Sequence, residues 1–216
     1  MEDFKKGELI ADRGATILSQ GSHGSHFYTV LSGTAFRYKL LEDGRRQILN
    51  YLFPGDLVGL QASILGEMQH SAEALTPMKL CIFEKDRIGE FFGKHSGLAY
   101  DMTWIAAREE RILDEHLLSI GRRSALERAA YLLAFLAMRA KSLKRQAGLD
   151  NSLPITQAHV ADTLGLSIVH TNKTLRKLQE RGLVRWLERG CEVLDEEALR
   201  KIAGWEPQAH ERRPFI

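Results

Sequence analysis

Side chains with the chemistry of DNA contact gather around residue 170. If Thr171 is the buried centre of a helix that turns about 100° per residue, then the residues that point away from the core are Val169, Lys173, Arg176 and Glu180. Lysine and arginine can neutralise phosphates or donate to a guanine edge, and a short aliphatic side chain can touch a thymine methyl. This face is therefore predicted to enter the major groove of double-stranded DNA. The residues predicted to contact DNA are Thr156, Gln157, Ser167, Ile168, Val169, His170, Asn172, Lys173, Arg176 and Lys177.

Residues suited to metal binding or catalysis are scattered by contrast. Cys81 and Cys191 lie far apart without CxxC or Cys/His spacing, so neither a disulfide framework nor a structural zinc site is predicted. His23 and His26 are three residues apart, whereas a cupin-like metalloenzyme needs His-x-His with a Glu and a further His on one metal. Such an enzyme stays a weaker alternative. Because no Ser/His/Asp or Cys/His arrangement is discernible, we predict no catalysis, no metal and no cofactor.

The two cysteines have different predicted surroundings. Cys81 lies in an apolar segment and is predicted to be an inert buried thiol. Cys191 lies near Arg185 and Arg189, and neighbouring positive charge could lower its pKa and make it redox-responsive. An ordinary half-buried residue is the alternative.

The elements that position the DNA-contacting face can be read from residues 155–184. Thr156 is a suitable N-cap for a first short helix, Gly165 supplies a tight turn, and Ser167 can cap a second helix. On that second helix Thr171 and Leu175 point inward at helical spacing. The pattern predicts a helix-turn-helix whose second helix reads the major groove, and a helical hairpin inside a core is the alternative.

Residues 8–84 consist of short segments rich in β-branched and aromatic residues, separated by glycines. Asp43-Gly44 between two of them predicts a hairpin, because this pair tolerates the positive φ of tight turns. Such a pattern predicts an antiparallel β-roll, or jelly roll.

Helices dominate the rest of the chain. We predict a long helix over 96–119, a hinge at Gly121–Arg123, a second helix over 124–144, a β-hairpin wing turning at Arg189-Gly190 and a last helix over 196–205. The predicted fold is therefore α+β. It comprises a β-roll effector or sensor domain (1–95), a dimerisation helix with hinge (96–121) and a winged helix-turn-helix DNA-binding domain (122–216).

Charge is unevenly divided along the chain. Residues 1–120 contain 13 Lys and Arg against 17 Asp and Glu, a net charge of −4, whereas residues 121–216 contain 17 against 11, a net charge of +6. A basic C-terminal part favours DNA as the partner. No apolar run is long enough to cross a bilayer, and the first residues lack the layout of a secretory signal. We therefore predict a cytoplasmic protein with no membrane partner.

The long helix carries a stripe with the 4-3-4-3 spacing of a coiled-coil seam. A lone surface helix could show the same stripe by packing on its own β domain, which is the alternative. Leu113 and Leu117, however, widen this stripe enough to serve both the β-roll and a partner helix. A homodimer on a palindromic operator is predicted, since two-fold DNA sites call for two-fold proteins. The predicted dimer-interface residues are Leu98, Met102, Ile105, Glu109, Ile112 and His116.

The order β-roll, long helix, helix-turn-helix and wing resembles the Crp/Fnr superfamily of bacterial transcription regulators. The most specific similarities are PGDLVGLQA at 54–62 and ITQAHVADTLGLS at 155–167, and the resemblance covers essentially the whole chain. It implies a cyclic-nucleotide-binding-like domain and a dimeric DNA-binding regulator, which would contact RNA polymerase if it is an activator.

Departures from this superfamily concern the effector pocket. Cyclic-AMP-binding relatives carry a Glu for the ribose and an Arg-Ser pair for the phosphate, whereas here Asp56 takes the acidic position and His70-Ser71 is the only match to the pair. A mostly neutral histidine cannot replace the guanidinium fork. We predict that cyclic AMP is not the effector, while a regulatory module for another small ligand stays an alternative. The candidate pocket residues are Gly55, Asp56, Leu57, His70, Ser71, Ile112 and Leu113.

Two cofactors occur among members of the superfamily, an iron–sulfur cluster and haem. FNR-type oxygen sensors hold an iron–sulfur cluster on four cysteines, three of them near the N-terminus, and this chain has none before Cys81. No such cluster is predicted. Haem-sensing relatives use axial histidines, and the histidines available here are His23, His26, His70, His95 and His116. Each of these is more often a surface or hydrogen-bonded histidine than a ligand, so haem is not predicted.

The predicted recognition helix also differs from the pattern of the superfamily. Family members commonly place Arg-Glu after the capping serine, and the Glu accepts a hydrogen bond from cytosine N4. This chain has Ile168-Val169 there, which cannot accept a hydrogen bond, and Lys173 stands at the position of the guanine-reading Arg. The operator is therefore expected to differ from the best-known half-sites.

Overall fold

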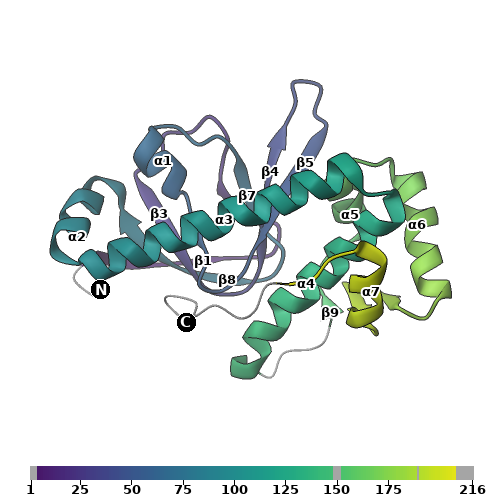
Figure 1. The fold of residues 1–216 in the computed structure, drawn as a ribbon. Helices are drawn as coiled ribbons and strands as arrows, with labels where there is room; N and C mark the ends of the chain where they lie inside the picture. Colours follow the sequence, from purple (N-terminus) through teal and green to yellow (C-terminus); the bar gives the residue numbers. More distant parts are fainter. Residues whose placement is uncertain (1–3, 148–151, 189, 208–216) are drawn as a thin grey trace. The chain divides into compact units, whose positions relative to one another are not determined.

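A computed structural model describes residues 4–147, 152–188 and 190–207 (Figure 1). The chain divides into two compact units, one made of the described residues up to Leu113 and the other of those from Asp114 onward. The division falls inside one long helix, so the predicted domain limits remain a prediction.

The first unit is the predicted antiparallel β-roll. One sheet has the order β1-β8-β3-β6 and the other the order β2-β7-β4-β5, with all pairs antiparallel. The bounds are β1 Lys5–Ala11, β2 Thr16–Leu18, β3 His26–Ser32, β4 Ala35–Leu40, β5 Arg46–Leu52, β6 Leu57–Val58, β7 Ser71–Ala74 and β8 Met78–Glu84. Side chains of both sheets, among them Val30, Ala72 and Leu80, form one buried core.

Turn residues of the β-roll behave as predicted. The β4–β5 hairpin closes at Leu40 and Arg46 across the Asp43-Gly44 turn. Gly33, between β3 and β4, has a φ of 84°, and an added Cβ would lie 2.4 Å from the carbonyl oxygen of Pro77. Only glycine fits there. Two short helices were not anticipated, α1 (Leu60–Leu65) after β6 and α2 (Ile88–Lys94) after β8, and β1 starts before residue 8.

Helix α3 runs from Ser96 to Arg122, three residues beyond the predicted end. The predicted break at Gly121 is therefore misplaced, because a glycine alone costs a helix only about 1 kcal/mol. The break falls at Arg123 and Ser124, where a new helix begins. The Ser124 N–H donates to the Glu127 carboxylate (2.7 Å) and the Glu127 N–H to the Ser124 hydroxyl (3.4 Å), which is the capping-box exchange.

The second unit is a winged helix-turn-helix. Helix α4 (Ala125–Ala147) contacts α5 (Gln157–Leu164), α6 (Ile168–Glu180) and α7 (Glu196–Ala203). The wing strands β10 (Val184–Leu187) and β11 (Gly190–Val193) pair with each other, and β9 (Ser152–Leu153) joins β11. The predicted turn residue Arg189 lies outside the described residues. Leu133, Val160 and Leu175 are fully buried. None of the described helices combines the length and the apolar character needed to cross a membrane.

Candidate DNA-binding face and effector pocket

The first helix of the motif is fixed at its start by a reciprocal cap. The Thr156 hydroxyl accepts from the His159 N–H, and Nδ1 of His159 accepts from the Thr156 N–H, both over 3.2 Å. A histidine therefore takes the place that Glu or Gln usually holds in a capping box. At the other end Gly165 adopts φ 64° and ends the helix in the left-handed conformation.

Helix α6 presents the predicted face to solvent. Ser167 caps it by accepting from the His170 N–H over 3.3 Å. Thr171, Leu175 and Leu178 are buried, as the periodicity predicted. Their burial leaves the opposite side of the helix outward, and the exposed residues of α6 are Ile168, Val169, His170, Asn172, Lys173, Arg176, Lys177, Gln179 and Glu180.

The electrostatics of this face favour an anion. The first turn of α6 contains no acidic residue, so the partial positive charge of the helix start is not compensated. Arg176 is paired with Glu180 over 2.9 Å, but both side chains are more than half exposed. Such a pair is weak, and Arg176 can exchange it for a phosphate. Of the two residues predicted before α6, Thr156 is exposed and Gln157 is half-buried.

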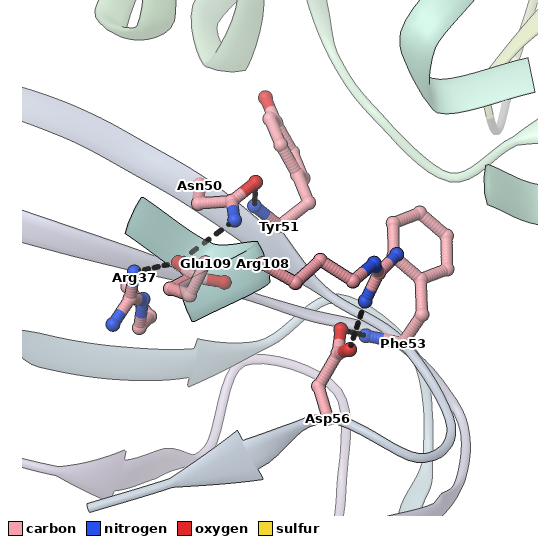
Figure 2. A network of polar contacts seen from close by, with 7 residues as sticks. All are labelled: Arg37, Asn50, Tyr51, Phe53, Asp56, Arg108 and Glu109. Atoms are coloured by element: carbon pink, nitrogen blue, oxygen red, sulfur yellow. Dashed lines mark hydrogen bonds and ion pairs between the residues drawn. The ribbon is translucent and has the colours of Figure 1, made fainter. Parts of the chain in front are cut away.

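The acidic residue of the predicted pocket is engaged within its own chain (Figure 2). Asp56 is buried, its Oδ2 accepts from the Phe53 N–H over 2.8 Å, and its Oδ1 lies 3.5 Å from Nη1 of Arg108 on α3. Gly55 (φ 84°) turns the chain before it, and Leu57 begins β6. Asp56 thus anchors α3 to the β-roll.

A second polar contact joins the same helix to the neighbouring strands β4 and β5. The Glu109 carboxylate accepts from the Arg37 guanidinium on β4 and from Nδ2 of Asn50 on β5, the latter over 2.9 Å (Figure 2). Asn50 also accepts from the Tyr51 N–H over 2.8 Å, which fixes its orientation. Sequence reasoning missed Arg37, Asn50 and Arg108. The sequence did offer one signal, because Arg37 is a charged residue at a strand position that points inward.

Of the remaining pocket candidates, His70, Ser71 and Ile112 are buried. Burial, followed by the charges of Arg37 and Lys39, lowers the pKa of His70 to about 4, so this imidazole is neutral. The Ser71 hydroxyl accepts from the Gln20 N–H over 2.9 Å. Ile112 is buried, whereas Leu113 is exposed. The polar atoms of Asp56 and Ser71 are thus held by separate partners.

The predicted dimer seam lies against its own chain. Leu98 and Met102 pack with Phe27 and Phe83 of the β-roll, and Ile105 and Ile112 are buried. Glu109 is bound as described, and Nδ1 of His116 lies 2.8 Å from the Tyr131 hydroxyl. Four of the six predicted residues are therefore buried within the chain, whereas Leu98 and Glu109 are half-buried, and their place in a dimer interface stays a prediction. The exposed apolar residues of α3 are Tyr100, Leu113, Leu117 and Leu118.

The environment predicted for Cys191 is wrong in one respect. Its side chain is fully buried, and burial together with Glu192 raises its pKa to about 12. The Arg185 guanidinium is paired with the Glu192 carboxylate (2.5 Å), which compensates its charge, and Arg189 lies outside the described residues. Cys81 is buried as predicted, and burial raises its pKa too. Within the described residues no cluster of three or more His, Cys, Asp or Glu could hold a metal ion.

Comparison with known proteins divides the sequence in the same way. Residues 5–95 match the family model of the cyclic nucleotide-binding domain, and residues 127–202 match that of the Crp-like helix-turn-helix domain. The nitrogen fixation regulation protein FixK of Bradyrhizobium diazoefficiens is 34% identical over 191 residues, which are 88% of this chain and 79% of that protein. The transcriptional activatory protein AadR of Rhodopseudomonas palustris is 31% identical, over 87% of this chain and 77% of its own length.

Solved structures agree on the fold. FixK2 from Bradyrhizobium japonicum superposes with a TM-score of 0.77 at 24% identity, covering 93% of this chain and 98% of that one. A CRP-family transcriptional regulator from Thermus thermophilus gives a TM-score of 0.78, also at 24% identity, over 94% of this chain and 100% of that one. The predicted α+β architecture, with a β-roll followed by a helix-turn-helix, is confirmed.

Proposed function

The chain belongs to the Crp/Fnr family of DNA-binding transcription regulators, and we propose that it acts as a homodimer on a palindromic operator without cyclic AMP. The observation that carries this proposal is the outward face of α6. It is basic, has no acidic residue in its first turn, and is held by the Ser167 cap at one end and buried Leu175 and Leu178 along its back. A rigid helix with such a face suits the major groove.

Binding-site selection tests the DNA-binding proposal directly. The full-length protein is mixed with a pool of random double-stranded DNA, and bound fragments are sequenced after several rounds. We expect an inverted repeat whose half-sites are about 10 base pairs apart, centre to centre, because two recognition helices of a symmetric dimer meet DNA one turn apart. Selection of a single unrepeated site would contradict the two-fold model.

The dimer contact is proposed for the exposed side of α3. Tyr100 and Leu117 are each 71% exposed, an unusual state for large apolar residues on one helix. Leu113 and Leu117 are four residues apart and lie on one face. Leu117→Asp is expected to give a monomer by light scattering, whereas Leu41→Asp, at an exposed leucine of the β4–β5 hairpin, should stay dimeric. A wild-type monomer at micromolar concentration would refute the dimer.

Independence from cyclic AMP rests on the state of the predicted pocket. A ligand phosphate would meet a neutral His70, and the acidic residue that should take the ribose hydroxyl is bonded to Arg108 and Phe53. Binding would therefore have to break an ion pair on the β-roll. Calorimetry is expected to give no heat of binding for cyclic AMP at millimolar concentration. A low-micromolar dissociation constant would contradict this part.

Activation is a further element of the proposal. AadR is named a transcriptional activatory protein, and an activator of this kind would have to contact RNA polymerase in the cytoplasm. We assign no catalytic role to the chain. In vitro transcription from a promoter carrying the selected operator distinguishes activation from repression.

A further inference from the structure

The start of helix α6 holds two apolar side chains that the fold leaves in solvent. Val169 is 62% exposed and Ile168 is 46% exposed. From Ser152 to Trp186, among the residues that the structure describes, these two are the large apolar side chains left exposed. Other aliphatic residues of the motif, such as Val160 and Leu175, are fully buried, and Leu166 is half-buried. The exposed pair therefore does not serve the core.

The position of Val169 points to the bases. Val169, Lys173 and Arg176 lie within about 60° of one another around the helix, on its outward side. Val169 is the second residue after the Ser167 cap, and the N-terminal residues of a recognition helix are those that reach base edges. Arg176, two turns deeper, lies where a helix passes the phosphates.

An aliphatic side chain can recognise only one group in the major groove. The C5 methyl of thymine is the apolar feature of the base edges, and every other feature is a hydrogen-bond donor or acceptor. Valine pressed against cytosine N4 or guanine O6 would strip water from these atoms without replacing the hydrogen bond. Valine against the thymine methyl buries apolar surface on both sides.

We propose that Val169 reads thymine through its methyl group, so that the operator half-site carries an A·T pair under the start of α6. This inference rests on the proposed DNA-binding function and names part of its specificity. Four helical residues span about 6 Å, close to two base-pair steps of 3.4 Å. The thymine is therefore expected within about two base pairs of the base read by Lys173.

Removal of the methyl alone tests the proposal. After the wild-type protein has selected its operator, each thymine of the half-site is replaced in turn by deoxyuridine, which lacks the methyl and keeps every hydrogen-bonding group. Burial of one methyl contributes about 0.8 kcal/mol, so affinity should fall about four-fold when one half-site is changed and about fifteen-fold when both are. The effect should be confined to the position facing Val169.

Two variants complete the cycle. In Val169→Ala the thymine and deoxyuridine operators should bind with equal affinity, whereas Leu194→Ala, at an exposed leucine outside α6, should keep the four-fold difference. If deoxyuridine is neutral at every position, or if its effect persists in Val169→Ala, thymine reading by Val169 is overturned while DNA binding stands. If no sequence is selected from the pool, the proposed function fails first and the inference with it.

Discussion

Loss of the Glu109 charge should destabilise the β-roll measurably. The side chains of Arg37 and Glu109 are 13% and 26% exposed, so this ion pair is largely shielded from water. Nε of Arg37 is already buried without a hydrogen-bond partner among the described residues, which leaves the guanidinium few ways to compensate. In Glu109→Gln the amide oxygen can still accept from Asn50, but the charge facing Arg37 is gone.

The expected loss can be built from these contacts. A hydrogen bond to a charged group contributes about 1.5–3 kcal/mol, so Glu109→Gln should lower the free energy of unfolding by about 2 kcal/mol. Glu109→Ala also leaves the Asn50 amide without its acceptor, which adds about 1 kcal/mol to the loss of unfolding free energy. Replacement of both partners, Arg37→Leu with Glu109→Leu, should recover most of the loss, because no buried charge is then left alone.

Urea denaturation of the full-length variants, followed by circular dichroism, measures these differences. The matched control is Asp43→Asn, which also converts an acid into its amide in an ion pair of the same unit. Arg45 and Asp43 are 76% and 55% exposed, so that change should cost less than about 0.5 kcal/mol. A loss for Glu109→Gln no larger than for the control would show that the contact does not hold α3.

Three further outcomes are expected. Lys173→Ala should relax the base preference at one symmetric pair of operator positions, at a cost of about 1–3 kcal/mol in binding free energy. Arg176→Ala should instead weaken binding to all sequences alike and reduce the slope of log affinity against log salt concentration by about one unit. Both effects are measured by DNA binding at several salt concentrations. Mild peroxide should leave DNA binding unchanged, because the buried Cys191 thiol, with a pKa of about 12, is protonated at neutral pH. A loss of DNA binding that disappears in Cys191→Ser but persists in Cys81→Ser would contradict this expectation. Burial lowers the pKa of His70 to about 4 in the folded chain, whereas the ordinary value is 6.5. Between these two pH values the unfolded chain therefore binds more protons than the folded chain. Stability should therefore fall as pH falls from about 6.5 to about 4, and this slope should flatten in His70→Gln.

The helix-turn-helix could be predicted almost residue by residue because its signals are local. Caps at Thr156 and Ser167 are fixed by side-chain oxygens a few atoms from the N–H groups they serve. Inward residues such as Thr171 follow from helical periodicity alone. The β-roll was predictable as a class for the same reason, since glycine turns and short apolar segments need no knowledge of distant partners. Helices α1 and α2 are too short to show a period and were missed.

Partners across the fold could not be predicted, and the seam of α3 shows why. A 4-3 spacing states that one face of a helix is apolar, but it does not say which surface covers that face. Met102 meets the β-roll, so the stripe that resembles a coiled coil is buried within the chain. Glu109 interrupts the stripe in the sequence, yet it is the residue bound by Arg37 and Asn50. A polar residue in an apolar seam is thus evidence for a specific buried partner, because its desolvation must be compensated. The exposed face with Leu113 and Leu117 is therefore where a second copy should be sought.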